Sequence, residues 1–113
     1  MISDGPSGLR QQLHEADYFG IHESEPSICY PAPVTCASTF DRSLLYQLGE
    51  SLGSDCLDQD VAMLLTPGVN QKRSPLAGRN FEYYSEDPYL SSEMASYLIL
   101  GLQSKGIAPC LKH

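Results

Sequence analysis

The sequence predicts an α/β protein in which short apolar strands alternate with amphipathic helices. Two stretches repeat apolar residues at helical spacing, and short apolar runs stand before, between and after them. This order is typical of parallel strands joined by right-handed helical crossovers. In such folds ligands bind beyond the carboxyl ends of the strands, so we expect a site there.

Three segments are predicted as strands. Met1-Ile2 reads as the tail of an apolar strand that runs into a turn at residues 3–6. Residues 61–65 (VAMLL) form a continuous apolar run, which is typical of a strand buried on both faces. Residues 107–111 (IAPCL) form the third, in which Pro109 weakens the prediction because proline donates no ladder hydrogen bond.

Two segments are predicted as helices. Asp41 is a suitable N-cap for a helix from residue 42 to about residue 58. Asp87-Pro88 opens a second helix, which runs to about Ser104 and is closed by Gly106. The apolar stripe of the first consists of Leu44, Leu45, Leu48, Leu52 and Cys56, and that of the second consists of Leu90, Met94, Tyr97, Leu98, Gly101 and Leu102.

Two long connections separate these elements. Residues 5–35 are predicted to be irregular, and the prolines of residues 24–33 argue against a helix there. Residues 67–86 show no regular pattern either. A loop of that length is usually functional or disordered, and its aromatic residues argue against disorder.

The composition narrows the class of partner. Seven Lys and Arg residues stand against fourteen Asp and Glu residues, for a net charge of −7. This balance argues against nucleic acid and anionic membranes and favours a neutral or cationic ligand. No apolar stretch is long enough to span a bilayer, and no export signal is visible, so we expect a cytoplasmic location.

The four cysteines are Cys29, Cys36, Cys56 and Cys110. They show neither C-x-x-C spacing nor a histidine at zinc-ligand spacing, so we expect no metal and no cofactor. Buried or half-buried free thiols are the preferred interpretation. The spacing leaves both disulfides and a catalytic role open.

Length and chain ends predict a fragment. The 113 residues fall well short of the roughly 250 of a complete β/α barrel. Apolar runs stand at both ends, and a domain seldom ends on a strand with nothing after it.

Polar residues follow each predicted strand: Asp4, then Arg79 in the long loop, then Lys112-His113. Directional donors and acceptors on one rim suit a ligand rich in hydroxyl groups. Each has another explanation. Asp4 could bond its own turn, Arg79 could form a surface ion pair with Glu82 or Glu86, and Lys112-His113 could mark an arbitrary truncation point.

Four segments carry a resemblance: SDGPSGLR (3–10), STFDRSLLYQLGESLG (38–53), LLTPGVNQKRSPLAGRNFEYYSEDPYLSSEMA (64–95) and GLQSKGIAPCLKH (101–113). Together they resemble the N-terminal barrel domain of glycoside hydrolase family 3, the bacterial β-glucosidases especially. The resemblance implies that residues 1–113 are part of a (β/α)8 TIM-type barrel, incomplete at both ends. Ser7 stands where relatives often have His, and Ala77 where Cys is frequent.

The resemblance also implies site residues. Asp4, Arg79, Lys112 and His113 would bind sugar hydroxyls, and from spacing and charge we infer that Glu82 orients Arg79. The family implies hydrolysis of terminal β-D-glycosidic bonds with retention, by a nucleophile and an acid/base that both lie in later sequence. We therefore expect no catalytic residue in this chain, and no turnover by the chain alone.

Two other classes are considered. One is a non-catalytic α/β fragment or carbohydrate-binding module without turnover of its own. The other, a flavodoxin-like domain, is disfavoured because no Gly-rich loop runs from a strand into a helix.

Overall fold

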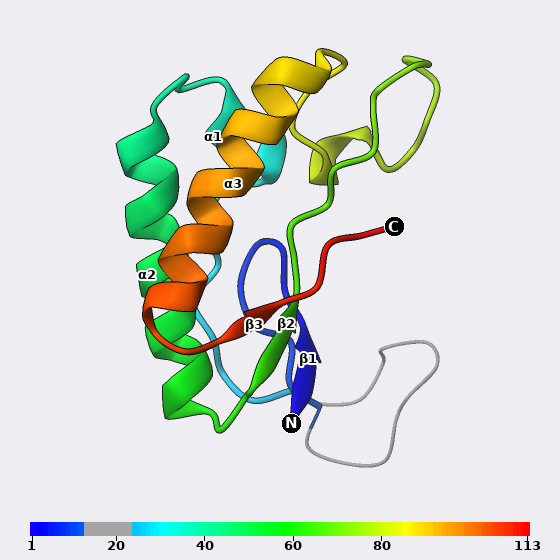
Figure 1. Cartoon of the computed structure of the whole chain (residues 1–113). Helices are drawn as coiled ribbons and strands as arrows, with labels where there is room; N and C mark the ends of the chain where they lie inside the picture. Colours follow the sequence, from blue (N-terminus) through cyan, green and yellow to red (C-terminus); the bar gives the residue numbers. More distant parts are fainter. Residues whose placement is uncertain (13–23) are drawn as a thin grey trace.

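The computed structural model describes residues 1–12 and 24–113 (Figure 1). Within them the elements are β1 (Ile2–Asp4), α1 (Pro33–Ala37), α2 (Arg42–Asp58), β2 (Met63–Leu65), the 3-10 helix η1 (Asn80–Glu82), α3 (Pro88–Ser104) and β3 (Ala108–Pro109). Figure 1 shows α2 and α3 side by side, covering one side of the small sheet. The predicted α/β class with its alternation of strand and helix is confirmed.

The sheet has the order β1-β2-β3 with both neighbouring pairs parallel, as predicted. Asp4 pairs with Leu65, so it is the last residue of β1 and does not lie in the turn where the sequence placed it. The other strands are shorter than predicted. Pro109 is tolerated in β3 because the N–H groups on either side carry the ladder: Ala108 donates to Ala62 O at 3.0 Å and Cys110 to Leu64 O at 2.9 Å.

Helix α2 begins where predicted. The Asp41 carboxylate accepts from the N–H groups of Ser43 and Leu44, at 2.8 and 3.1 Å. The predicted stripe is wrong at Leu44, which is 44% exposed, whereas Leu45 is fully buried. Glycines complete the buried face, which consists of Leu45, Gly49, Leu52, Gly53 and Cys56. The predicted stripe left out Gly49 and Gly53, which carry no apolar side chain, and included the exposed Leu44.

The two long helices pack backbone against backbone. A Cβ added at Gly49 would lie 2.3 Å from Leu98 O, and one added at Gly101 would lie 2.2 Å from Tyr46 O. Helix α3 is capped as predicted, because the Asp87 carboxylate accepts from the N–H of Leu90 at 2.9 Å. It ends at Ser104, and Gly106 follows with a φ of +79°.

The core lies between the helix pair and the sheet. Its fully buried leucines are Leu45, Leu52, Leu64, Leu98 and Leu102. The short helix α1, in a stretch predicted to be irregular, adds Cys36 and Ala37. Its five residues are too few to show a helical stripe, although Pro33 stands at the first helical position, where proline is favoured.

All four cysteines are free thiols. Cys36 and Cys56 are buried and Cys110 is half-buried, which agrees with the preferred interpretation, but Cys29 is exposed. Burial, aided by the neighbouring Asp55 charge, raises the pKa of the Cys56 thiol to about 11, so this thiol is protonated at neutral pH.

Within the described residues, no helix is both long enough and apolar enough to cross a membrane.

Candidate functional site

The four polar residues predicted to lie at the strand ends contact one another in pairs. Lys112 Nζ donates to Asp4 Oδ1 at 2.6 Å, and Arg79 Nη2 lies 2.7 Å from His113 Nε2. Because Lys112 and His113 are adjacent in sequence, the two pairs form one group, which we call the polar rim. In Figure 1 the C-terminal residues lie below the loop that joins β2 to α3, which carries Arg79.

Asp4 is held by a tight reversal of the chain. Its carbonyl accepts from Arg10 N at 2.9 Å, which closes the turn. Within the turn, a Cβ added at Gly5 would lie 2.5 Å from Gly8 O. Gly8 has a φ of +124°, and a Cβ there would lie 2.1 Å from Ile28 O. The carboxylate bonds Lys112, 108 positions away in sequence, so it does more than close its own turn.

Hydrogen bonds of their backbone hold Lys112 and His113 against the segment that follows β2. The N–H of Lys112 donates to Pro67 O at 3.1 Å, and its carbonyl accepts from Val69 N at 2.9 Å. Asn70 Oδ1 accepts from the N–H of His113 at 2.9 Å. The Thr66-Pro67 and Lys112-His113 peptide bonds are both cis. The Lys112 side chain is only 13% exposed, against 47% for Asp4, so Lys112 is the more buried partner of this pair.

Arg79 immediately precedes η1 and is held by it. Its Nε donates to the carboxylate of Glu82, which is buried. The hydrogen bond to Glu82 is the main cause that raises the pKa of Arg79. A guanidinium has five N–H groups, and the bonds to Glu82 and His113 engage two of them. The remaining donors are available to a ligand, because the side chain is largely exposed.

His113 is kept neutral by its surroundings. Desolvation, followed by the positive charges of Arg79 and Lys112, lowers its pKa, and the charges of Glu82 and Asp4 oppose this in part. A neutral imidazole has one donor nitrogen and one acceptor nitrogen. The ring can therefore accept a hydrogen bond from Arg79 at neutral pH.

Two residues at the rim were missed by the sequence interpretation. The Tyr83 hydroxyl lies 3.1 Å from His113 Nδ1, and the two rings meet edge to face at 80° with centroids 5.7 Å apart. Asn70 holds the His113 backbone. Nothing in the sequence spacing separates Tyr83 from its neighbour Tyr84, which is also buried, so the sequence gives no sign of the contact with His113.

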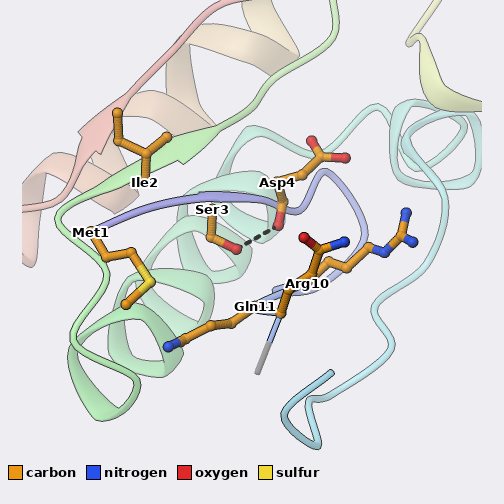
Figure 2. Close-up of a pocket in the computed structure, with 7 residues that line it drawn as sticks. Met1, Ile2, Ser3, Asp4, Arg10 and Gln11 are labelled. Atoms are coloured by element: carbon orange, nitrogen blue, oxygen red, sulfur yellow. Dashed lines mark hydrogen bonds between the residues drawn. The ribbon is translucent and has the colours of Figure 1, made fainter. Parts of the chain in front are cut away.

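A hollow beside β1 is a different place from the polar rim. It has a volume of about 350 Å³ and is lined in part by Met1, Ser3, Arg10 and Gln11 (Figure 2). Asp4 alone of the rim residues lines it, and in Figure 2 its carboxylate points to the side opposite Gln11. We assign the candidate site to the polar rim, because that is where charged groups from three segments converge.

The rim offers a carboxylate, an ammonium, a guanidinium and an imidazole, which are hydrogen-bonded in two pairs, and the carboxylate of Glu82 lies behind the guanidinium. Hydroxyl groups both donate and accept, so such a set suits a polyhydroxylated ligand. In residues 1–12 and 24–113 no group of three or more His, Cys, Asp or Glu side chains is arranged to hold a metal ion.

Comparison with known proteins gives a consistent family. Residues 14–113 match the family described as Glycosyl hydrolase family 3 N terminal domain. Thermostable beta-glucosidase B of Acetivibrio thermocellus is 51% identical over 113 residues, which is all of this chain and 15% of that protein. Exo-alpha-(1->6)-L-arabinopyranosidase of Bifidobacterium longum is 44% identical over 114 residues, with the same coverage.

Solved structures of β-glucosidases are similar to this chain as well. Beta-glucosidase 3B from Thermotoga neapolitana in complex with glucose has a TM-score of 0.86 at 43% identity, covering 99% of this chain and 15% of that one. Beta-glucosidase from Kluyveromyces marxianus in complex with glucose has a TM-score of 0.90 at 39% identity, covering 99% of this chain and 13% of that one. The chain thus spans only about 15% of the length of the first relatives that it matches.

Proposed function

Because the chain belongs to glycoside hydrolase family 3, we propose that it forms the sugar-binding part of a retaining β-glucosidase that hydrolyses terminal β-D-glycosidic bonds. The observation that carries this proposal is the polar rim. Asp4, Arg79, Lys112 and His113 come from three strand ends, and they meet where an α/β sheet places its ligand. We extend the proposal to the fold: the three parallel strands belong to a (β/α)8 barrel.

The rim contacts suggest how each group would hold a sugar. The free oxygen of Asp4 accepts from one hydroxyl, while Lys112, with two of its three N–H groups uncommitted to Asp4, donates to the oxygen of the same or a neighbouring hydroxyl. Arg79, oriented by Glu82, donates to a further hydroxyl. Related β-glucosidases have been solved with glucose, which supports a glucoside as the ligand.

Two carboxylates, Asp4 of the rim and Glu82 beside it, are poorly suited to catalysis. Retaining hydrolysis needs two carboxyl groups about 5–5.5 Å apart, one of them free to attack the anomeric carbon. Asp4 is paired with Lys112 and Glu82 with Arg79, and Glu82 is buried as well. We propose that both act in binding or support, that the nucleophile and the acid/base lie outside residues 1–113, and that the chain alone does not turn over a β-glucoside.

A binding module without turnover is the less favoured reading. The relatives described above match all or nearly all of the chain and are named as glycosidases, namely three β-glucosidases and an arabinopyranosidase. The arabinopyranosidase indicates that the preferred sugar varies among relatives, and the choice of a β-glucoside for this chain rests on the β-glucosidases.

The test uses the whole glycosidase that carries this chain and an aryl β-glucoside. Lys112→Ala removes a partly buried charged donor, so we expect kcat/KM to fall by about 3 kcal/mol of transition-state binding. Asp4→Ala should have a similar effect. Asp58→Ala, at an exposed position at the end of α2, is the matched control. Unchanged kinetics for both rim variants would refute the assignment of the site.

A further inference from the structure

His113 is fixed from three sides. Its backbone N–H donates to Asn70 Oδ1 at 2.9 Å, its Nε2 lies 2.7 Å from Arg79 Nη2, and its Nδ1 lies 3.1 Å from the Tyr83 hydroxyl. Both ring nitrogens are therefore engaged.

The partner of Nε2 decides which nitrogen carries the proton. A guanidinium only donates hydrogen bonds, so Nε2 must be the acceptor in its contact with Arg79. In a neutral imidazole the other nitrogen then carries the proton. Nδ1 therefore donates, and the Tyr83 oxygen accepts. The desolvation and positive charges that lower the pKa of His113 agree with a neutral ring.

Tyr83 is itself well anchored. It is only 7% exposed, and its backbone N–H donates to Asn80 O at 3.3 Å at the end of η1. Its ring packs against Gly68, where an added Cβ would lie 3.1 Å from a ring carbon. Gly68 forms a parallel bridge with Lys112. The hydroxyl thus has a defined place relative to the backbone of His113.

We propose that Tyr83 is a positioning residue of the sugar site, whose hydroxyl accepts the hydrogen bond from Nδ1 of His113 and fixes the orientation of the ring, with Nε2 toward Arg79. This rests on the proposed function, because it concerns the same rim. Arg79 is then oriented from two directions, by Glu82 at Nε and by His113 at Nη2. In the other tautomer Nε2–H would oppose an N–H of Arg79.

The first test reads the tautomer directly and needs no sugar. In the chain labelled with 15N-histidine, two-bond 1H–15N correlation spectra at pH 7.5 distinguish a protonated ring nitrogen from an unprotonated one. We expect a protonated Nδ1 and an unprotonated Nε2 for His113. His113→Gln identifies its signals against those of His14 and His22.

The variant Tyr83→Phe keeps the ring and removes the acceptor, so we expect the Nδ1 signal of His113 to shift because its N–H loses its hydrogen-bond partner, while Nε2 stays unprotonated. Tyr89→Phe is the control, because Tyr89 is exposed on α3 and its hydroxyl contacts Arg42. Circular dichroism verifies that both variants keep the fold. An Nε2–H tautomer in the unsubstituted chain, or no change in folded Tyr83→Phe, would overturn the proposal.

The second test separates this proposal from the function on which it rests. In the whole glycosidase, Tyr83→Phe should lower kcat/KM for an aryl β-glucoside about tenfold, as expected for one lost hydrogen bond between neutral groups, and Tyr89→Phe should leave it unchanged. If Lys112→Ala is impaired while Tyr83→Phe is fully active, the positioning role is wrong and the sugar site stands. If neither variant changes kcat/KM, the sugar site fails, and the positioning role fails with it even where the His113 signals respond as expected.

Discussion

The helix pair and the polar rim are held together by different interactions. Helices α2 and α3 meet through glycines and buried leucines, and the nearest atoms at Gly49 and Gly101 belong to backbone. The rim is held by charged side chains that are partly exposed, such as Asp4 and Arg79. Burial of apolar area dominates folding energy, whereas half-exposed ion pairs contribute little to it. Substitutions in the helix pair should therefore mainly lower stability, whereas substitutions in the rim should mainly weaken binding.

The largest effect is expected where the helices are closest. Gly101→Ala adds a methyl group that would lie 2.2 Å from Tyr46 O and 2.9 Å from Glu50 N, both backbone atoms that cannot yield cheaply. We expect the free energy of unfolding to fall by about 3 kcal/mol or more. Urea denaturation followed by circular dichroism measures it.

Gly78→Ala is the matched control, because nothing lies within 4 Å of a Cβ added at Gly78. Its free energy of unfolding should stay within about 0.5 kcal/mol of the unsubstituted chain. Equal losses for the two variants would show that the helices do not pack through Gly101.

A somewhat smaller effect separates two neighbouring leucines of α2. Leu45→Ala empties a fully buried position and should cost about 3 kcal/mol of unfolding free energy. Leu44→Ala, at a position that is 44% exposed, should cost less than about 1 kcal/mol. The same denaturation experiment measures both. A larger loss at Leu44 would restore the stripe that the sequence predicted.

Removal of a rim charge should affect stability less. Asp4→Ala is expected to lower the free energy of unfolding by about 1 kcal/mol or less, because Asp4 is 47% exposed. Its effect on kcat/KM should be larger, near 3 kcal/mol. Thermal unfolding and kinetics on the same preparation compare the two. A stability loss as large as that of Leu45→Ala would mean that the rim is part of the structural core.

The smallest effect on the protein is expected from chemical labelling of its thiols. Cys29 is exposed and should react readily with a thiol reagent at pH 7.5, whereas Cys56 is buried and its thiol, with a pKa near 11, stays protonated. Mass spectrometry after brief labelling should show modification at Cys29 and none at Cys56 until urea is added. Rapid labelling of Cys56 in buffer would contradict the described core.

Much of this fold could be predicted from local signals. Asp41 and Asp87 start their helices where capping chemistry places them, and the apolar run before Thr66 becomes the central strand. Helix α1 and the glycine contacts of α2 could not be predicted, because a five-residue helix shows no period and glycine carries no side-chain pattern.

The residues of the candidate site were likewise predictable only in part. The parallel-strand rule places Asp4, Arg79, Lys112 and His113 together from their positions after strands. Tyr83 and Asn70 could not be predicted, because their roles depend on how the long loop folds back toward the end of β3. Tyr83 and Tyr84 are both buried, but the Tyr83 hydroxyl contacts His113, and sequence spacing does not encode that contact.

The bridge between Gly68 and Lys112 fixes how many residues can separate the strands from the rim. Lys112 points to Asp4 because its backbone is paired with residues 67 and 69, and side chains of an extended segment alternate between faces. A single-residue insertion between Leu111 and Lys112 would move Lys112 out of the backbone pairing that points it to Asp4, while leaving every helix and every core leucine in place. The number of residues between the strands and the rim is therefore a requirement for binding. Substitutions that conserve charge leave this number unchanged, so they would not reveal the requirement.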